Sequence, residues 1–115
     1  MIKSFKHKGI AFERPDTIRR VQEKLLAKQL AYCLKYSPYY QMLIKRVRLG
    51  KGKSALKVLA DIPFTQKRDL EKYNDKFLAV KPEQIVDIVL SSGTTGQPTR
   101  MMYSEVDLLI ALLFL

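Results

Sequence analysis

The segment Ser91–Thr99 combines two serines, three threonines and two glycines in nine positions. Glycines let a backbone turn sharply and approach a ligand closely. Successive backbone N–H groups in such a turn form a concavity that favours negative charge. Hydroxyl groups add hydrogen bonds to an ionised acceptor, each worth about 1.5–3 kcal/mol. The residues therefore predict a phosphate-binding loop or, equally well, a polar hairpin loop between two strands.

Three other motifs built from glycine and serine do not fit this segment. Gly93 and Gly96 are three positions apart and no Lys-Ser or Lys-Thr pair follows them, which excludes the Walker-type phosphate loop. The dinucleotide-binding pattern with three glycines is not formed either. Ser92 does not lie in a Gly-x-Ser-x-Gly turn, and the single histidine, His7, is far from it in the sequence. We therefore assign no catalytic residue to this chain.

The segments on the two sides of the loop, which must position it, are predicted to be strands. Residues Ile85–Leu90 are short and β-branched and run directly into the loop, and Met101–Tyr103 is expected to form the next strand. Residues Lys81–Glu83 predict a turn before the first strand. Ser104 and Asp107 have the spacing of a capping box, which predicts a last helix.

The region before residue 76 has a helical pattern. Residues 1–15 are expected to be an extended lead-in, followed by a helix with Asp16 or Thr17 as its N-cap. This helix should end before Ser37-Pro38, because the residue before a proline avoids the helical backbone region. Its predicted apolar stripe is Ile18, Val21, Leu25, Leu26, Leu30 and Cys33.

Three further helices are expected in this region. Ser37 should cap one of them, with Pro38 in its first turn. A short helix is expected near residues 55–60, and Thr65 should cap another near residues 66–74.

These elements predict an α/β fold in a single, incomplete domain. Residues 1–16 lead in, residues 17–75 form a helical N-terminal half, and residues 76–115 supply the first strands, the loop and a helix. Because the last helix is still apolar at Leu115, we expect it to continue in a longer protein.

The order Ser-Ser-Gly-Thr-Thr-Gly-x-Pro-Thr after an apolar strand resembles the phosphate-binding loop of the adenylate-forming (AMP-binding) enzymes. Thr99, where other branches have lysine, is most similar to the phenylacetate–coenzyme A ligase branch. Residues Ser37–Tyr40 resemble that branch's Ser-Pro-Phe/Tyr-Tyr element, and residues Ile62–Leu70 resemble its Leu-Pro-Phe-Thr-Thr-Lys-x-Asp-Leu element. The resemblance covers most of residues 17–110.

The resemblance implies an ATP-dependent ligase. Members of this family let a carboxylate attack the α-phosphorus of ATP, which gives an acyl-adenylate and pyrophosphate. The thiol of coenzyme A then displaces AMP and forms a thioester. Mg²⁺ neutralises the phosphates, and the loop holds the β- and γ-phosphates. Such a loop contributes to the reaction mainly by positioning the phosphates and by stabilising their charge. By position, the residues that would line this loop are Ser91, Ser92, Gly93, Thr94, Thr95, Gly96 and Thr99.

Two departures from the family pattern limit this expectation. Gln97 stands where the branch often has lysine, which removes a positive charge beside the phosphates. Family members are several times longer, and their adenine, ribose and acyl sites, Mg²⁺-binding acid and catalytic lysine all follow the loop. We therefore expect an N-terminal fragment that is inactive alone, and that forms a homo-oligomer or docks onto the remainder of its protein.

The charge of the chain supports a second interpretation. The 115 residues include 21 Lys and Arg against 11 Asp and Glu, a net charge of +10. Residues 1–57 hold 15 of the basic residues and three acidic ones. This excess is typical of a solvated basic face, and also of a helical binding module for nucleic acid or another anionic partner. The residues that would form such a surface are Arg14, Arg19, Arg20, Lys24, Lys28, Lys45, Arg46, Arg48, Lys51 and Lys53.

The remaining composition excludes several classes. One cysteine and one histidine make a metal site or an internal disulfide unexpected. No apolar segment follows the basic N-terminus as in a signal peptide, and the run Leu108–Leu115 is shorter than the ~20 residues that span a membrane. We therefore expect a cytoplasmic protein. A third interpretation is an assembly partner whose unfinished sheet and last helix dock onto another chain.

Overall fold

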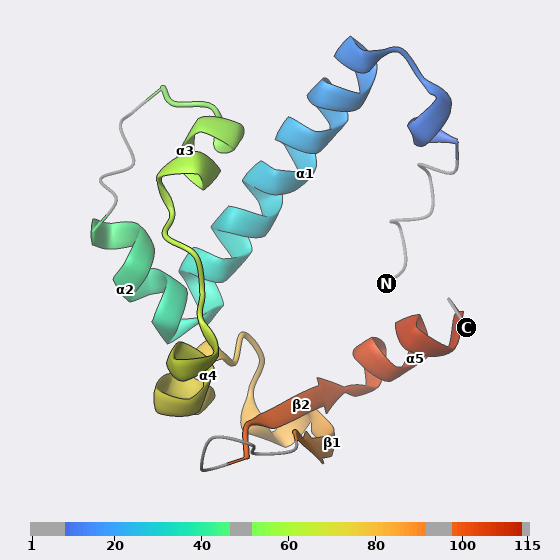
Figure 1. The fold of residues 1–115 in the computed structure, drawn as a ribbon. Coiled ribbons are helices and arrows are strands. Elements are labelled where there is room, and N and C mark those ends of the chain that lie inside the picture. The colour runs from blue at the N-terminus through green and yellow to red at the C-terminus, as the bar shows by residue number, and fades with distance from the viewer. Residues whose placement is uncertain (1–8, 47–51, 92–97, 114–115) are drawn as a thin grey trace.

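The computed structural model describes residues 9–46, 52–91 and 98–113 (Figure 1). The predicted α/β class is confirmed, with a helical N-terminal half followed by a two-stranded antiparallel sheet. The helices are α1 (Pro15–Tyr36), α2 (Pro38–Arg46), α3 (Ala55–Asp61), α4 (Lys67–Tyr73) and α5 (Glu105–Leu113), and the strands are β1 (Ile85–Leu90) and β2 (Arg100–Ser104). Short 3₁₀ turns are η2 (Ile10–Phe12), η3 (Asn74–Phe77) and η4 (Pro82–Gln84).

The start of α1 differs from the prediction. The helix begins at Pro15, so Arg14 is its N-cap and neither Asp16 nor Thr17 has that role. The fixed φ of proline suits the first helical position, where its missing N–H has no intrahelical partner to lose. The wholly extended lead-in is also wrong, because η2 forms a turn after Gly9, whose φ is 95°. Residues 1–8 lie outside the described residues.

Ser37 separates α1 from α2 and connects this junction to η3. The predicted end of α1 is confirmed, since Ser37 has extended backbone angles before Pro38. Its side chain is buried, and its hydroxyl donates to the carbonyl oxygens of Lys76 at 3.2 Å and Phe77 at 3.4 Å. Ser37 directly precedes α2, and its carbonyl oxygen accepts from the Gln41 amide at 2.9 Å. Its hydroxyl donates to η3, and the predicted cap of α2 by the oxygen of that hydroxyl stays a prediction.

The core lies where α2 meets η3 and where α3 meets α1. Tyr39 and Ile44 of α2 are 5% and 1% exposed, and Ala55 and Val58 of α3 are also buried. The ring of Tyr39 stacks on that of Phe77 with centroids 3.8 Å apart. The predicted stripe along α1 holds no fully buried residue, so this helix presents a half-buried apolar side to its neighbours.

A carboxylate of α1 holds the start of α3. The predicted helix near residues 55–60 is confirmed as α3, and Ser54 is its N-cap. Both carboxylate oxygens of Glu23 accept hydrogen bonds from the first amides of α3, those of Ala55 and Leu56. Because the amides of a first helical turn lack intrahelical acceptors, this carboxylate completes their hydrogen bonding and fixes α3 against α1.

Helix α4 begins one residue later than predicted. Gln66, and not Thr65, is the N-cap. The carboxylate of Asp69, three residues on, accepts from the backbone amide of Gln66 at 2.8 Å, and this spacing fixes the first turn.

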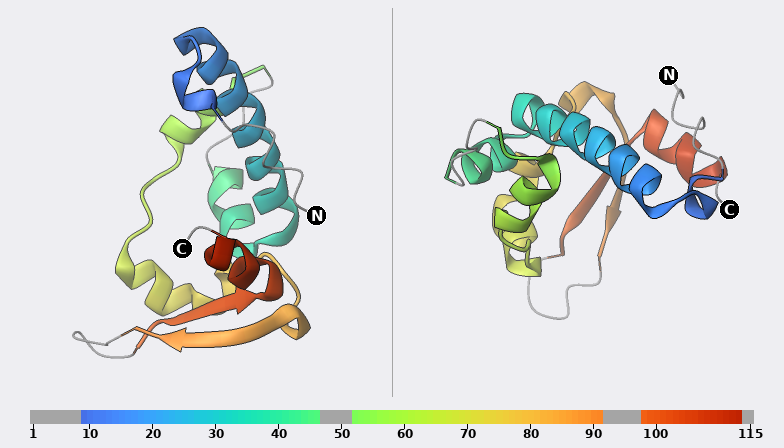
Figure 2. Two further views of the ribbon diagram at one scale, coloured as in Figure 1. Left: turned by 90° about the vertical axis from the view of Figure 1, so that its right-hand side faces the viewer. Right: turned by 90° about the horizontal axis from the view of Figure 1, so that it is seen from above.

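The sheet lies at one end of the molecule, with the helical half on one side of it and an open face on the other (Figure 2). Both predicted strands are confirmed, and Leu90 pairs with Arg100 while Asp87 pairs with Tyr103. A register irregularity lies between Ile85 and Asp87. On β1, Ile88 and Leu90 are 51% and 59% exposed, so the strand carries apolar side chains that no described element covers.

The predicted capping box at the start of α5 is confirmed. The carboxylate of Asp107 accepts from the Ser104 amide at 2.9 Å, and the Ser104 hydroxyl accepts from the Asp107 amide at 3.4 Å. The turn predicted at Lys81–Glu83 is present as η4. No helix in the described ranges is long and apolar enough to cross a membrane.

We expect the stability of the protein to fall at alkaline pH through Tyr39. Burial raises the pKa of its phenol, and the charge of Asp69 raises it further. A raised pKa means that the folded protein favours the neutral phenol, so this contribution is complete below the ordinary value of about 10 and is lost as the pH rises through the folded-state value. Urea unfolding between pH 8 and pH 11 should show a steeper decline for the wild type than for Tyr39→Phe. Parallel declines would contradict the expectation.

Candidate functional site

The two ends of the predicted phosphate-binding loop lie together beside the hairpin. The pairing of β1 with β2 places Leu90 opposite Arg100. The backbone amide of Ser91 then donates to the carbonyl oxygen of Thr99 at 3.0 Å, and the Thr99 amide donates to the Ser91 hydroxyl oxygen at 3.1 Å. These two hydrogen bonds close the base of the connection, so the chain leaves β1 and returns to β2 at one point.

Two of the seven predicted site residues belong to this base, and five lie beyond it. Ser91 and Thr99 are described and are hydrogen-bonded to one another. The other five lie outside the described residues, and their role remains a prediction: Ser92, Gly93, Thr94, Thr95 and Gly96. The strands do form a hairpin, which agrees with both interpretations of the loop, since a phosphate-binding turn and a polar hairpin loop each need closely spaced ends.

Thr99 has an unusual polar environment. The residue is 8% exposed, and its side-chain oxygen Oγ1 is buried with no hydrogen-bond partner among the described residues. Buried hydroxyl groups are normally hydrogen-bonded, because leaving one unpaired costs about 1–3 kcal/mol. Thr99 also borders a hollow of about 300 Å³ together with Glu71, Asn74, Leu90, Pro98 and Arg100. Thr99 therefore combines a buried, unpaired hydroxyl with a place in the lining of this hollow.

Three polar residues that sequence reasoning missed fix the exit of the loop. The guanidinium Nη2 of Arg100 lies 2.6 Å from Oδ1 of Asp75. The side-chain amide of Asn74 donates to the backbone carbonyl oxygen of Arg100 at 3.0 Å, and its oxygen accepts from Nε of Arg100 at 3.3 Å. No local pattern indicates these contacts, because Arg100 and its partners are about 25 positions apart and only the folded chain joins them.

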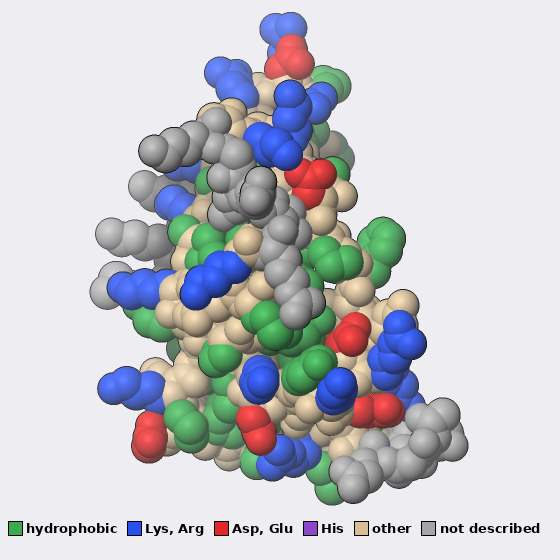
Figure 3. All heavy atoms as spheres, turned by 90° about the vertical axis from the view of Figure 1, so that its left-hand side faces the viewer, with side chains coloured by type: hydrophobic (Ala, Val, Ile, Leu, Met, Phe, Trp, Pro, Cys, Tyr) green, Lys and Arg blue, Asp and Glu red, His purple; other side chains and the backbone are tan. Residues whose placement is uncertain are grey.

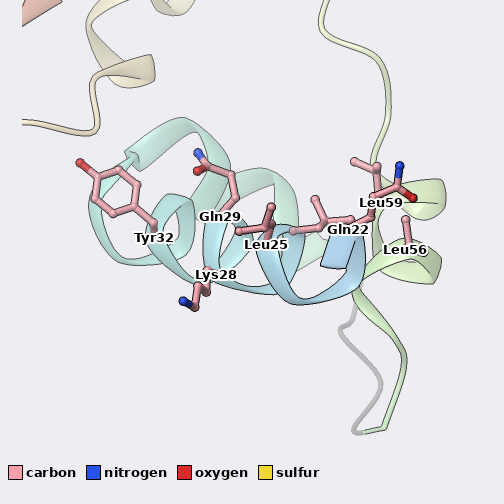
Figure 4. Close-up of a pocket in the computed structure, with 8 residues that line it drawn as sticks. Gln22, Leu25, Lys28, Gln29, Tyr32, Leu56 and Leu59 are labelled. Atoms are coloured by element: carbon pink, nitrogen blue, oxygen red, sulfur yellow. The ribbon is translucent and has the colours of Figure 1, made fainter. Parts of the chain in front are cut away.

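A larger hollow lies away from the loop, between α1 and α3 (Figure 4). Four of the eight residues that line this groove of about 810 Å³ are leucines, with Leu25 on α1 facing Leu56 and Leu59 on α3. Gln22, Gln29 and Tyr32 lie along α1, and Lys28 is the one charged residue of the lining. The residues that line this groove include no acid and no cysteine, serine or threonine nucleophile.

Among the residues that the structure describes, Lys and Arg side chains are scattered over the side of the molecule that carries α2 and α3 (Figure 3). Lys and Arg side chains are distributed from top to bottom of this face, with hydrophobic and acidic side chains between them. The nucleic-acid interpretation also includes Arg46, Arg48 and Lys51. The structure does not describe the side chain of Arg46 or any part of the other two residues. Within the described ranges, no three His, Cys, Asp or Glu residues are placed to hold a metal ion.

Comparison with known proteins links the chain to one group of enzymes. It is 37% identical over 95 residues to the phenylacetate–coenzyme A ligase of Thermus thermophilus, a match that covers 81% of this chain and 21% of the relative. The corresponding ligase of Pseudomonas putida is 33% identical over 95 residues, or 81% of this chain and 22% of the relative. The ligase of Escherichia coli is 32% identical over 112 residues, which is 94% of this chain and 25% of the relative. The chain thus spans about a fifth to a quarter of the length of these relatives, and no protein-family model matches it.

Proposed function

We propose that this chain, a relative of the phenylacetate–coenzyme A ligases, supplies the phosphate-binding loop of an enzyme that activates a carboxylic acid with ATP. In the proposed reaction the carboxylate attacks the α-phosphorus, and the bond between this phosphorus and the bridging oxygen breaks to release pyrophosphate. The acyl-adenylate then reacts with the thiol of coenzyme A, which forms a thioester and releases AMP. The observation that carries the proposal is the similarity to ligases over at least 81% of this chain.

The described residues of the loop suit a leaving pyrophosphate. The hydroxyl of Ser91 accepts from the Thr99 amide, and its hydrogen remains available to donate to a phosphate oxygen. The Thr99 hydroxyl has no protein partner in the described part of the chain, so a phosphate oxygen can accept its hydrogen without breaking an existing bond. Hydrogen bonds placed before the reaction stabilise charge that develops on the pyrophosphate oxygens.

The other loop residues extend this assignment by resemblance. We propose that the hydroxyls and amides of Ser92, Gly93, Thr94, Thr95 and Gly96 complete the site for the β- and γ-phosphates. Mg²⁺ would be bound with these phosphates and would neutralise part of their charge. The described residues offer it no cluster of acidic ligands, so we assign it no ligand from them.

We further propose that residues 1–115 are one part of an N-terminal ligase domain, with a lead-in over residues 1–16, a helical region over residues 17–75 and the loop region over residues 76–115. The apolar residues of β1 and α5 support this division. Leu90 of β1 is 59% exposed and Leu112 of α5 is 69% exposed, which is the exposure expected where further strands and helices of a domain pack.

The chain alone should catalyse no exchange between ATP and pyrophosphate. A phosphate-binding loop holds the leaving group, but adenylate formation also needs sites for adenine and for the acid. We expect radiolabelled pyrophosphate to enter ATP at the background rate when the purified chain is incubated with ATP, Mg²⁺ and phenylacetate or other aryl acids. A full-length phenylacetate–coenzyme A ligase serves as the positive control. Exchange above background would contradict the proposed division of roles, whereas failure to bind pyrophosphate at all would contradict the proposed loop function.

A further inference from the structure

We infer that Arg100, Asn74 and Asp75 are positioning residues that hold Thr99, at the exit of the proposed phosphate-binding loop, beside Ser91. This inference rests on the proposed function, and it assigns a role to a polar contact that the ligase relationship does not by itself include. The three residues join the first position of β2 to η3, which lies at the edge of the helical half. We call them the exit clamp.

The exit clamp fixes both the side chain and the backbone at position 100. Asp75 holds the guanidinium through Nη2 at 2.6 Å, and the side-chain oxygen of Asn74 accepts from Nε at 3.3 Å. The amide nitrogen of Asn74 also donates to the carbonyl oxygen of Arg100 at 3.0 Å. Three directed contacts on one residue restrict its position and its orientation, which a single flexible ion pair would not do.

Stability alone does not account for these contacts. The side chains of Arg100 and Asp75 are 47% and 72% exposed. Exposed ion pairs contribute little to the free energy of unfolding, because water screens the charges and two long side chains lose conformational freedom. The contacts therefore matter more for where the chain is held than for how firmly the whole protein is folded.

The exit clamp is joined directly to the base of the loop through the peptide between Thr99 and Arg100. Thr99 precedes Arg100, and its amide and carbonyl form the two hydrogen bonds to Ser91. Any shift of Arg100 therefore moves the peptide that orients the Thr99 hydroxyl. On the other side, η3 is anchored to the core by the Ser37 hydroxyl and by the stacking of Phe77 on Tyr39. A continuous set of contacts thus runs from the core through η3 to the loop.

A direct attraction between the Arg100 charge and the phosphates is the competing explanation, and the chain offers variants that separate the two. Asn74→Ala removes two clamp contacts without changing the charge. Asp75→Asn removes a negative charge, so direct electrostatics predicts tighter binding of an anion, whereas positioning predicts weaker binding. Arg100→Lys keeps the charge and one donor and should retain part of the wild-type affinity. Arg20→Gln, at an exposed position on α1, is the matched control for Arg100→Gln.

The experiment titrates the full chain with Mg²⁺ and inorganic pyrophosphate, and follows the amide signals of Ser91 and Thr99 by NMR. We expect Asn74→Ala, Asp75→Asn and Arg100→Gln to raise the dissociation constant by about 5- to 10-fold, because a small misplacement of binding groups weakens them together. Without pyrophosphate, the Thr99 amide should exchange with solvent faster in these three variants than in Arg20→Gln. The midpoint of thermal unfolding should change little.

Each outcome decides between the explanations. Tighter binding by Asp75→Asn would overturn positioning in favour of direct attraction, and wild-type affinity in Asn74→Ala would overturn the inference as well. A large drop in the unfolding midpoint of all three variants would show that the contacts are merely structural. If the wild type binds no pyrophosphate, the proposed function fails, and the exchange rates of the Thr99 amide still decide whether these residues hold the loop exit.

Discussion

Replacing Thr99 by valine is expected to stabilise the folded protein and to weaken its binding of pyrophosphate. The Oγ1 atom of Thr99 is buried without a partner in the described part of the chain, and valine has nearly the same shape without that polar atom. Removing an unpaired buried hydroxyl should raise the free energy of unfolding by about 1 kcal/mol. The lost hydrogen bond to an ionised phosphate is worth about 1.5–3 kcal/mol, which corresponds to an affinity about 10- to 150-fold lower.

Calorimetric titration with pyrophosphate and Mg²⁺, together with urea unfolding of the unliganded chain, measures both effects. Thr17→Val is a matched control, because it makes the same chemical change on α1, away from the loop. We expect this control to bind pyrophosphate like the wild type. If Thr99→Val also bound like the wild type, the hydroxyl would not be part of the phosphate site. If the variant lost stability, its hydroxyl would have a partner in the folded protein.

Opposite signs for stability and binding are typical of functional sites. A group kept unpaired in the free protein lowers stability slightly, and a ligand then completes its hydrogen bonding. A hairpin loop that binds no ligand predicts only the gain in stability, so the two effects together distinguish the interpretations. The Thr99 variant therefore tests the physical basis of the proposed function more directly than the removal of an exposed hydroxyl would.

Replacing Ile44 by alanine should lower the free energy of unfolding by about 2–5 kcal/mol, because it removes buried methyl groups and leaves a cavity. Ile44 of α2 is 1% exposed, and few other side chains in the described ranges are buried as deeply. Since small domains are stable by only about 5–15 kcal/mol, this loss is a large share of the total. Denaturant unfolding followed by circular dichroism measures it.

Leu112→Ala on α5 is the control for this truncation. The Leu112 side chain is 69% exposed, so a similar change in side-chain volume there should alter the free energy of unfolding by less than about 1 kcal/mol. Equal losses at the two positions would show that the core does not lie at α2. A loss only in Leu112→Ala would place the main stabilising contacts at α5 and the sheet.

Local patterns were sufficient to predict most elements. Proline and the residue before it predicted the junction at Ser37-Pro38, and the capping box predicted the start of α5. The β-branched run Ile85–Leu90 predicted β1. These features depend on neighbours within about four positions, so a linear sequence contains the information needed.

Contacts between distant residues could not be predicted in this way. The Ser37 hydroxyl donates to carbonyl oxygens of η3, about 40 positions away, a contact that no local pattern indicates. Glu23 binds the first amides of α3 from 32 positions upstream, and the exit clamp joins residues 25 positions apart. Such pairs depend on how helices are placed in space, and a serine or a carboxylate has several acceptable local partners before the chain folds.

In the candidate site, too, the local features could be predicted and the contacts between distant residues could not. The strands on both sides of the loop required Ser91 and Thr99 to be close, and the structure joins them by two hydrogen bonds. The resemblance to a ligase loop supplied the expected role of these residues. That the Thr99 hydroxyl is buried and unpaired, and that Arg100 is held from two sides, follows from packing between the sheet and η3 and has no counterpart in the local sequence.

The open face of β1 has a consequence for how the chain behaves in concentrated solution. Its six residues, Ile85–Leu90, are β-branched or aliphatic except for Asp87, and short segments of this type stack into cross-β fibrils. In such a stack, identical strands are about 4.7–4.8 Å apart, so the Asp87 carboxylates would form a column of like charges. Asp87 therefore has the position of a gatekeeper in this strand, and added salt, which screens like charges, should weaken its effect.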